Sequence, residues 1–576
     1  MRRGLLAMAI VVALTGCSPT GAGKQQSSTH ALPNTSWPAF RDAFIDGWFK
    51  LDPYFAAYQG KHQFDGQLPD WSPDGLKKQS DFLRDAIAEA IAFDASKLSA
   101  ADKFERDYLV NVAQGKLFWL DDADQPHHNP AYYVGDGLDP NVYVARNYAD
   151  KATRMKAMIA FFKNIPQATT NIRANLKAPM PLSFVNYGVA AFNGFADFYA
   201  GDARKAFADV KDPALQAEFL SASAAAAKSM SELGQWVEAQ RPTATQDFAL
   251  GTDRFARMLR ATEGVDVPID VLIEIGTHDL HDNQDALVAA CKIYAPGATI
   301  QACMAKMNAN KSPDGPVAEA RRQIPMLKAF VTSHNLISIP GTEEAVVEES
   351  PPYNRQNSAY IDPPGPFDKG IPSVYYISPP DPSWTKAVQD GFVPGKSDLL
   401  FTSVHEVMPG HFVQFLHANR SPSIFGQLFV GYAFAEGWAH YTEEMMWDAG
   451  LNDGDAETHI GQLANALLRN CRYLSAIGLH TGAMTQDQSR ELFIQQCFQD
   501  EGTARQQSAR GTYDPAYLNY TLGKLMIRRL RNDWIKTHGG REGWKAFHDA
   551  FLSYGGPPIP LVRQAMMKEA KPDAVF

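Results

Sequence analysis

The sequence predicts a mainly α-helical protein that contains one small antiparallel β-sheet. Long windows carry apolar residues at three- and four-residue spacings, the period of a helix that is buried along one face. Short apolar runs separated by pairs of prolines occur only between residues 336 and 380, and such runs are typical of strands. The composition agrees with a folded body, because 45% of the 576 residues are apolar and 20% are charged. These values exclude disordered, collagen-like and coiled-coil chains.

The first sixteen residues predict a signal peptide. Arg2 and Arg3 precede an apolar run from Leu5 to Leu14, which is too short to cross a bilayer as a stable helix. The following residues, Thr15 and Gly16, are small, as is typical before a cleavage point. We therefore expect residues 1–16 to be removed on export.

Cys17 predicts a lipid anchor. The residues Leu-Thr-Gly-Cys that end at Cys17 resemble a bacterial lipobox, whose cysteine becomes the acylated first residue. The alternative is a plain signal peptide followed by an incidental cysteine. Residues 17–36 are rich in Ser, Gly and Gln, which predicts a flexible tether. Because Ser18 follows the cysteine, the resemblance to lipoproteins implies the outer membrane, with the protein facing the periplasm.

Helical windows fill most of the next 300 residues. Gly and Pro residues separate them, and the run Ala224–Ala227 is a strong helix former. The expected helices are 37–58, 80–99, 101–120, 150–176, 213–238 and 268–294. We expect a helical N-terminal region over 37–335 and a second region over 336–576, which holds the sheet and further helices.

The predicted sheet lies just before the most informative helix. Its expected strands are 336–339, 345–349, 358–361 and 374–377, and proline pairs between them protect the sheet edges. The chain then becomes helical again near Ser397 and Asp398, which are good helix-capping residues.

The charge and the cysteines restrict partners and compartment. The formal charge is −10 without a basic patch, which excludes a nucleic-acid partner. Cys291, Cys303, Cys471 and Cys497 form an even set in an oxidising compartment, so disulfides are expected. Cys291 and Cys303 flank a Pro-Gly turn and are the favoured first pair, although the sequence leaves the pairing open.

A His-Glu pair followed by a second histidine predicts a zinc site. In H-E-x-x-H motifs the two histidines share one helix face and the glutamate acts as general base. Here His405 and Glu406 are followed by His411 at i+6, which is about 240° around a regular helix. Pro409 and Gly410 lie between them, and a break there would bring His411 back beside His405.

Glu436 is the expected third ligand. It lies in Glu-Gly-Trp-Ala-His-Tyr-Thr-Glu, which resembles the segment of gluzincin aminopeptidases whose first glutamate binds zinc. An alternative chelate would join Glu436 to His440 at i+4, and it ranks below His411. Together the patterns H-E-x-x-P-G-H and E-G-W-A-x-Y-x-E resemble a bacterial family of unknown function, many of whose members are lipoproteins. The resemblance extends from about residue 42 to 530 and implies a zincin-like helical metallopeptidase body.

Other site residues follow from the needs of amide hydrolysis. The resemblance to gluzincins implies a later Tyr or His that stabilises the oxyanion, and Tyr520 is the first choice and His480 the second. For substrate binding, Arg505 is the candidate for a carboxylate and Glu443 for an amine. The strand 373–377, which contains Tyr375, is expected to pair with an extended peptide along its edge.

The sequence therefore predicts a zinc-dependent hydrolase of the cell envelope. The leading hypothesis is a metallopeptidase that uses Zn²⁺ on His405, His411 and Glu436, with Glu406 as general base. One alternative is an amidase or esterase that acts on a non-peptide envelope substrate. Another is a non-catalytic binding lipoprotein with a degenerate zinc site. Exo- or endopeptidase action and the oligomeric state stay open.

Overall fold

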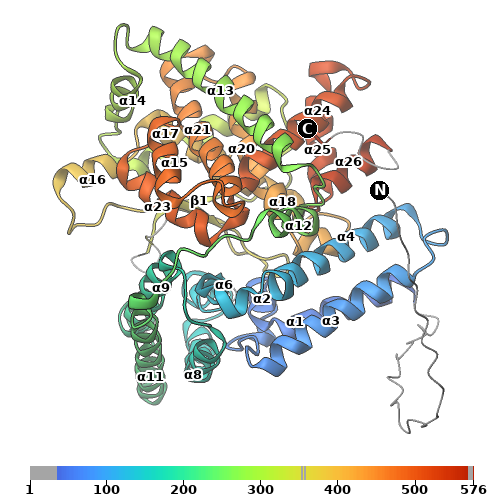
Figure 1. Ribbon diagram of the computed structural model, residues 1–576, viewed down its shortest axis with the longest axis vertical. Coiled ribbons are helices and arrows are strands. Elements are labelled where there is room, and N and C mark those ends of the chain that lie inside the picture. The colour runs from blue at the N-terminus through green and yellow to red at the C-terminus, as the bar shows by residue number, and fades with distance from the viewer. Residues whose placement is uncertain (1–35, 136, 352–354, 356–357, 569–574) are drawn as a thin grey trace, which may run out of the picture. The chain divides into compact units, whose positions relative to one another are not determined.

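Helices dominate the computed structural model, as predicted (Figure 1). The structure describes residues 36–576 apart from 136, 352–354, 356–357 and 569–574. The predicted signal peptide, Cys17 and nearly all of the predicted tether lie outside the described residues. Within them, no helix combines the length and the apolar character needed to cross a membrane.

The first group of helices surrounds an aromatic core. Trp37, Phe44, Trp48 and Tyr108 are buried there, and Phe425 from a later segment completes the cluster. The predicted window 37–58 is divided at Pro53, whose ring cannot continue a helix but suits its first turn. The helices are α1 (Trp37–Leu51), α2 (Pro53–Tyr58), α3 (Pro73–Ala92) and α4 (Ala100–Leu117), with α19 (Ile424–Leu428) packed against them.

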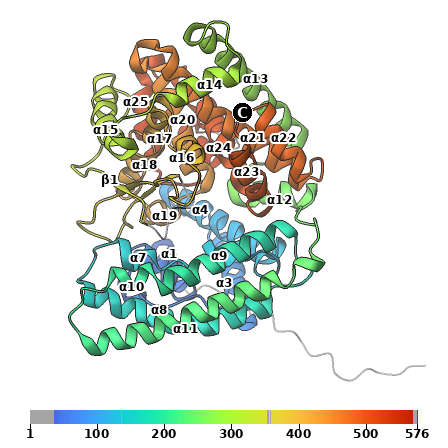
Figure 2. The same cartoon turned by 90° about the vertical axis from the view of Figure 1, so that its left-hand side faces the viewer.

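A second group forms its own core around two long helices. Figure 2 shows α8 and α11 side by side, and both contribute buried aromatic and aliphatic residues such as Phe162 and Phe219. The elements are α5 (Gln125–His128), α6 (Pro130–Gly135), α7 (Asn141–Ala145), α8 (Lys151–Asn175), α9 (Leu182–Ala200), α10 (Asp202–Ala206) and α11 (Pro213–Glu238).

Most of the remaining helices and the sheet share the largest core. This core contains residues from Phe118 to Val562, so it crosses the expected boundary at 335/336. Its long helices contact one another in pairs, notably α13 with α21 and α20 with α24. The helices are α12 (Thr252–Glu263), α13 (Ile269–Tyr294), α14 (Ile300–Ala309), α15 (Gly315–Ser333), α16 (Lys386–Phe392), α17 (Lys396–Glu406), α18 (His411–Ala418), α20 (Tyr432–Asp448), α21 (Ala456–His480), α22 (Gln486–Gln495), α23 (Glu501–Tyr513), α24 (Asn519–Ile535), α25 (Trp544–Ser553) and α26 (Ile559–Met567).

Local capping explains where several helices begin. Ser72, Ser99, Asp150, Asp212 and Asp455 each accept a hydrogen bond from a backbone N–H of the first turn. The expected cap at Ser397–Asp398 is displaced, because α17 begins at Lys396 and its N-cap is a glycine.

The sheet is mixed, which corrects the antiparallel prediction. Its strands are β1 (Val346–Glu349), β2 (Ala359–Asp362) and β3 (Val374–Ile377), in the order β1-β3-β2. β2 pairs antiparallel with β3, whereas β1 pairs parallel with β3, and 336–339 is not a strand. Because β3 is central, both of its edges are occupied by neighbouring strands. The prediction that 373–377 pairs with a substrate peptide is therefore wrong.

Two disulfides confirm the expected use of the cysteines. Cys291 bonds to Cys303 across a separation of 12 residues, and their Cα atoms lie 5.8 Å apart. Cys471 bonds to Cys497, which joins the middle of α21 to the residues that follow α22.

Candidate metal centre

A break between α17 and α18 brings the two histidines together. α17 ends at Glu406, and α18 begins at His411. The backbone N–H of Gly410 donates to the carbonyl oxygen of Val404, so the chain folds tightly back on the end of α17. A Cβ atom on Gly410 would lie 1.8 Å from the carbonyl oxygen of His405, so no larger residue fits there. The prediction of a break at Pro409–Gly410 is confirmed.

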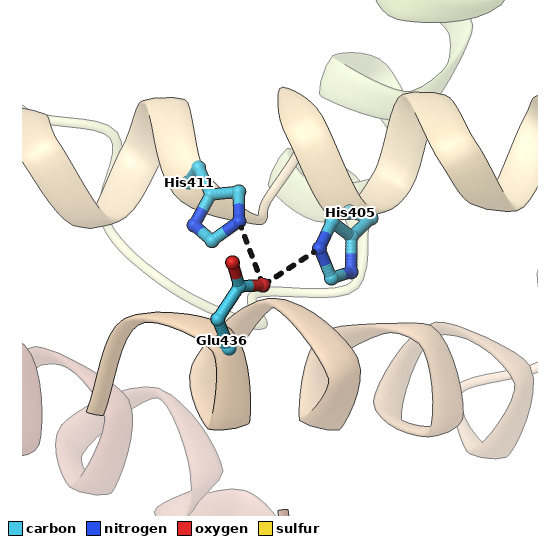
Figure 3. A group of neighbouring side chains, drawn as sticks. All are labelled: His405, His411 and Glu436. Atoms are coloured by element: carbon cyan, nitrogen blue, oxygen red, sulfur yellow. Dashed lines mark hydrogen bonds and ion pairs between the residues drawn. The ribbon is translucent and has the colours of Figure 1, made fainter. Parts of the chain in front are cut away.

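His405, His411 and Glu436 form one compact group. Figure 3 shows that both imidazole rings point at the carboxylate of Glu436, which lies on the facing helix α20. The distances from Glu436 Oε2 are 3.2 Å to His405 Nε2 and 3.3 Å to His411 Nε2. One ligand atom from each residue lies within 4.8 Å of the other two. The i+6 spacing is thus compatible with a joint site.

The partners of Glu436 set its protonation state. Burial raises the pKa of this carboxyl, but His411 and His405 outweigh burial and hold it well below its ordinary value. Burial and the Arg469 charge lower the pKa of His405, whereas Glu436 and Glu443 outweigh both and raise it to about 9. A metal ion bound by His405 Nε2 would therefore replace a proton at that atom.

Close packing of two helices holds Glu436 in place. A Cβ atom on Gly437 would lie 2.4 Å from the Cα atom of Gly523, so α20 and α24 touch backbone to backbone here. This contact brings Tyr520, at the start of α24, to the same group. The Tyr520 and His405 rings lie 6.2 Å apart.

Glu443 lies behind His405 and does not face substrate. Its side chain has no exposed surface, and Oε1 accepts a hydrogen bond of 2.7 Å from His405 Nδ1. Arg469 pairs with the same oxygen at 3.2 Å. The predicted role in binding a substrate amine is therefore wrong, because the carboxylate is enclosed and already paired. Glu443 instead orients His405.

His440 is not part of the group. It is fully buried, and its Nδ1 lies 3.4 Å from Glu443 Oε2. Burial lowers the pKa of His440 to about 4. The alternative chelate of Glu436 with His440 gains no support, because His411 occupies the position beside Glu436.

The donor set fits zinc. Two imidazole nitrogens and one carboxylate oxygen are one of the common ligand sets of a catalytic zinc ion, which keeps a further position for water. The bond from His405 Nδ1 to Glu443 places His405 Nε2 towards Glu436, as in the carboxylate–histidine pairs that support metal ligands. Nitrogen and oxygen donors at this spacing would hold the ion through His405, His411 and Glu436.

Glu406 and Tyr375 lie next to the centre. Glu406 is the last residue of α17, directly follows His405 in the chain, and is half-buried. Tyr375 is fully buried on β3, and burial followed by the Glu406 charge raises the pKa of its hydroxyl. Tyr375 therefore adjoins the expected general base from inside the core, which does not suit direct substrate binding.

Two further predicted residues lie away from the group. His480 is buried at the end of α21, where Nε2 donates to the Gly511 carbonyl oxygen and Nδ1 accepts from the Leu250 N–H. Both ring nitrogens are thus engaged by backbone, which corrects the oxyanion role. The Arg505 side chain is 70% exposed and pairs with Glu501, so it does not form the expected carboxylate site.

Three other arginines surround Tyr520, and sequence reasoning missed them. The guanidinium carbons of Arg472, Arg469 and Arg510 lie 4.8, 5.8 and 5.9 Å from the centre of the Tyr520 ring. Arg469 and Arg472 are three residues apart on one face of α21, in a stretch of the helix that has no other charged residue. That spacing was the available signal. Arg510 follows Arg505 on α23 but faces inward.

Comparisons with known proteins find one bacterial protein family and several solved structures that are similar to this chain. Residues 53–566 match the family model described as a bacterial protein of unknown function (DUF885). One similar structure is that of a candidate lipoprotein of unknown function from Shewanella oneidensis. It has a TM-score of 0.76 and 25% sequence identity, and the match covers 92% of this chain and 100% of the Shewanella chain. The structure of a candidate lipoprotein from Colwellia psychrerythraea has a TM-score of 0.79 and 14% sequence identity. The match covers 93% of this chain and 99% of the Colwellia chain. None of the curated proteins compared matches this chain.

Proposed function

The chain belongs to the DUF885 family of bacterial proteins of unknown function, and we propose that it is a zinc-dependent metallopeptidase. One observation carries the proposal: His405, His411 and Glu436 offer ligand atoms within 4.8 Å of one another. Glu406 directly follows the first ligand, as the general base does in zinc hydrolases.

The side chains of this centre have separate tasks. A zinc ion held there would act as a Lewis acid and lower the pKa of a coordinated water. Glu406 takes a proton from the attacking water and later passes it to the leaving amine. The Tyr520 hydroxyl donates a hydrogen bond to the oxyanion, since burial and then the Glu436 charge raise its pKa and keep it protonated.

Export and lipid anchoring belong to the same proposal. The lipobox-like residues before Cys17 support an acylated cysteine, and two similar structures are described as candidate lipoproteins. The two disulfides agree with an oxidising compartment. We place the enzyme at the outer membrane, facing the periplasm.

Zinc content and the Glu406→Gln variant test the proposal together. Purified protein is expected to hold one zinc per chain and to cleave members of a peptide pool, as followed by mass spectrometry. Glu406→Gln keeps the zinc and loses turnover, whereas Glu274→Gln, an exposed glutamate on α13, keeps both. Full activity of Glu406→Gln on every peptide that the wild type cleaves contradicts the mechanism.

A parallel assay on muropeptides separates the substrate classes. Zinc-dependent cleavage of these fragments without cleavage of any peptide would favour an envelope amidase. A folded protein that holds no stoichiometric zinc would instead favour a binding lipoprotein.

A further inference from the structure

Arg472 is a buried cation that has no carboxylate partner among the described residues. Only 9% of its surface is exposed. Its Nε donates to the Gln507 side-chain oxygen at 2.8 Å, and its guanidinium lies against the Tyr520 ring. Arginine is rarely buried without a paired anion, because removing its charge from water costs several kcal/mol, by order of magnitude.

The two neighbouring arginines each have a carboxylate partner. Arg469 pairs with Glu443 at 3.2 Å, and Arg510 pairs with Asp514 at 2.9 Å. The strongest electrostatic neighbours of Arg472 are Tyr520, Tyr432 and these two arginines. Burial and the two arginine charges lower the pKa of Arg472 and outweigh the tyrosines, which raise it. Three cations thus surround Tyr520, and one of them lacks a counterion within the part of the chain that the structure describes. This arrangement favours an anion that comes from outside the chain.

The position of Arg472 links that anion to the metal centre. The guanidinium lies 4.8 Å from the Tyr520 ring centre, which lies 6.2 Å from the His405 ring. Arg472 therefore lies at most about 11 Å from the His405 ring. Contacts of about 3 Å at each end leave room for roughly one extended residue between them. Tyr432 and Arg510 lie beside Tyr520, and each keeps part of its surface exposed to solvent.

We propose that Arg472 binds the free carboxylate at the C-terminus of a peptide substrate, so that the enzyme acts as a carboxypeptidase. This inference rests on the proposed metallopeptidase function. Arginine suits the task because its planar fork matches both oxygens of a carboxylate. In the reaction one water is consumed and the last amide C–N bond breaks. The hydroxyl joins the new carboxyl group, and the proton goes to the amine of the released amino acid.

Binding of small probes to the zinc-free protein tests the carboxylate site without turnover. The probes are N-acetyl-dialanine, its C-terminal amide, and N-acetyl-alanyl-aspartic acid amide, which carries a carboxylate only in its side chain. Calorimetric titration of the wild type is expected to show at least tenfold tighter binding of the free acid than of the amide. Equal binding of these two overturns the proposal. Equal binding of the aspartyl probe and the free acid also overturns it, because the site would then not distinguish a C-terminal carboxylate from a side-chain carboxylate.

Variants assign the effect to Arg472. Arg472→Met is expected to weaken free-acid binding about 30-fold or more, since it removes one partner of a buried charge pair. Arg472→Lys keeps the charge and recovers part of the loss. Arg505→Met, on the exposed face of α23, is the matched control and leaves binding unchanged. Unchanged preference for the free acid in folded Arg472→Met or Arg472→Lys refutes the assignment.

Turnover assays distinguish this inference from the proposed function. Wild-type protein with zinc is offered matched pools of peptides with free and amidated C-termini. Release of single C-terminal residues from the free-acid pool supports the inference. Cleavage of both pools at equal rates overturns it and leaves the metallopeptidase proposal standing. If neither pool is cleaved, the metallopeptidase proposal fails and the carboxypeptidase inference fails with it, although the probe titrations still report whether Arg472 binds a carboxylate.

Discussion

Replacing Gly410 by alanine is expected to dismantle the metal centre while most of the fold persists. The added Cβ atom would lie 1.8 Å from the His405 carbonyl oxygen and 2.5 Å from that of Val404. Contacts below 3.0 Å are essentially never seen for a Cβ atom, so the backbone must separate by about 1.2 Å. Metal ligands tolerate displacements of only about 0.2 Å. The relief of this overlap therefore moves His411 out of ligand range.

Zinc affinity is the direct measure of that displacement. Loss of a supporting contact typically costs 10–100-fold in metal affinity, and displacement of a ligand should cost more than about 100-fold. Competition titration against a fluorescent chelator gives the affinity, and circular dichroism shows whether the helices persist. Gly194→Ala is the matched control, because a Cβ atom there meets nothing within 4 Å on the exposed face of α9. Wild-type zinc affinity in a folded Gly410→Ala variant would refute the proposed ligand role of His411.

Three other expectations concern the supports of the site and fold. Glu443→Gln should weaken zinc binding about 10–100-fold in the same titration, because it removes the carboxylate that orients His405. Burial raises the pKa of Glu263 from its ordinary value of 4.5 to about 7. The folded protein therefore holds this proton more tightly than the unfolded chain, and the free energy of unfolding falls as the pH rises from about 4.5 through 7. Glu263→Gln should therefore exceed wild type by up to about 3 kcal/mol in urea unfolding at pH 8, with the gap closing towards pH 4.5. Replacing Cys291 and Cys303 by serine should cost about 3 kcal/mol in the same assay at fixed pH.

Each expectation has a result that contradicts it. Zinc binding within twofold of wild type in Glu443→Gln would remove its positioning role. A stability gap for Glu263→Gln that is constant from pH 4.5 to 8 would show that its carboxyl does not titrate differently on folding. A cysteine variant as stable as wild type would show that closing this 12-residue loop does not restrain the unfolded chain.

Local patterns in the sequence were sufficient for several long helices and for the candidate metal ligands. Helical periodicity and caps act within a few residues, so α8, α11 and α13 lie where the windows predicted them. The break before His411 also follows from local chemistry, because Pro409 and Gly410 stand between the two histidines. The sequence therefore predicted both the motif and the way in which its unusual spacing is resolved.

Strand order and the arginines around Tyr520 depended on tertiary structure. A four-residue strand has the same alternation at an edge and in the centre of a sheet, so nothing local places β3 between β1 and β2. Arg472, Arg510 and Tyr520 come from three different helices, and they meet because α21 packs against both α23 and α24.

The sequence by itself thus determined several long helices, the break and the candidate metal ligands, whereas the partners of those candidate ligands were decided by how the helices cross. Which face of a helix becomes a site depends on backbone contacts between segments far apart in the chain. Periodicity within one segment does not contain that information.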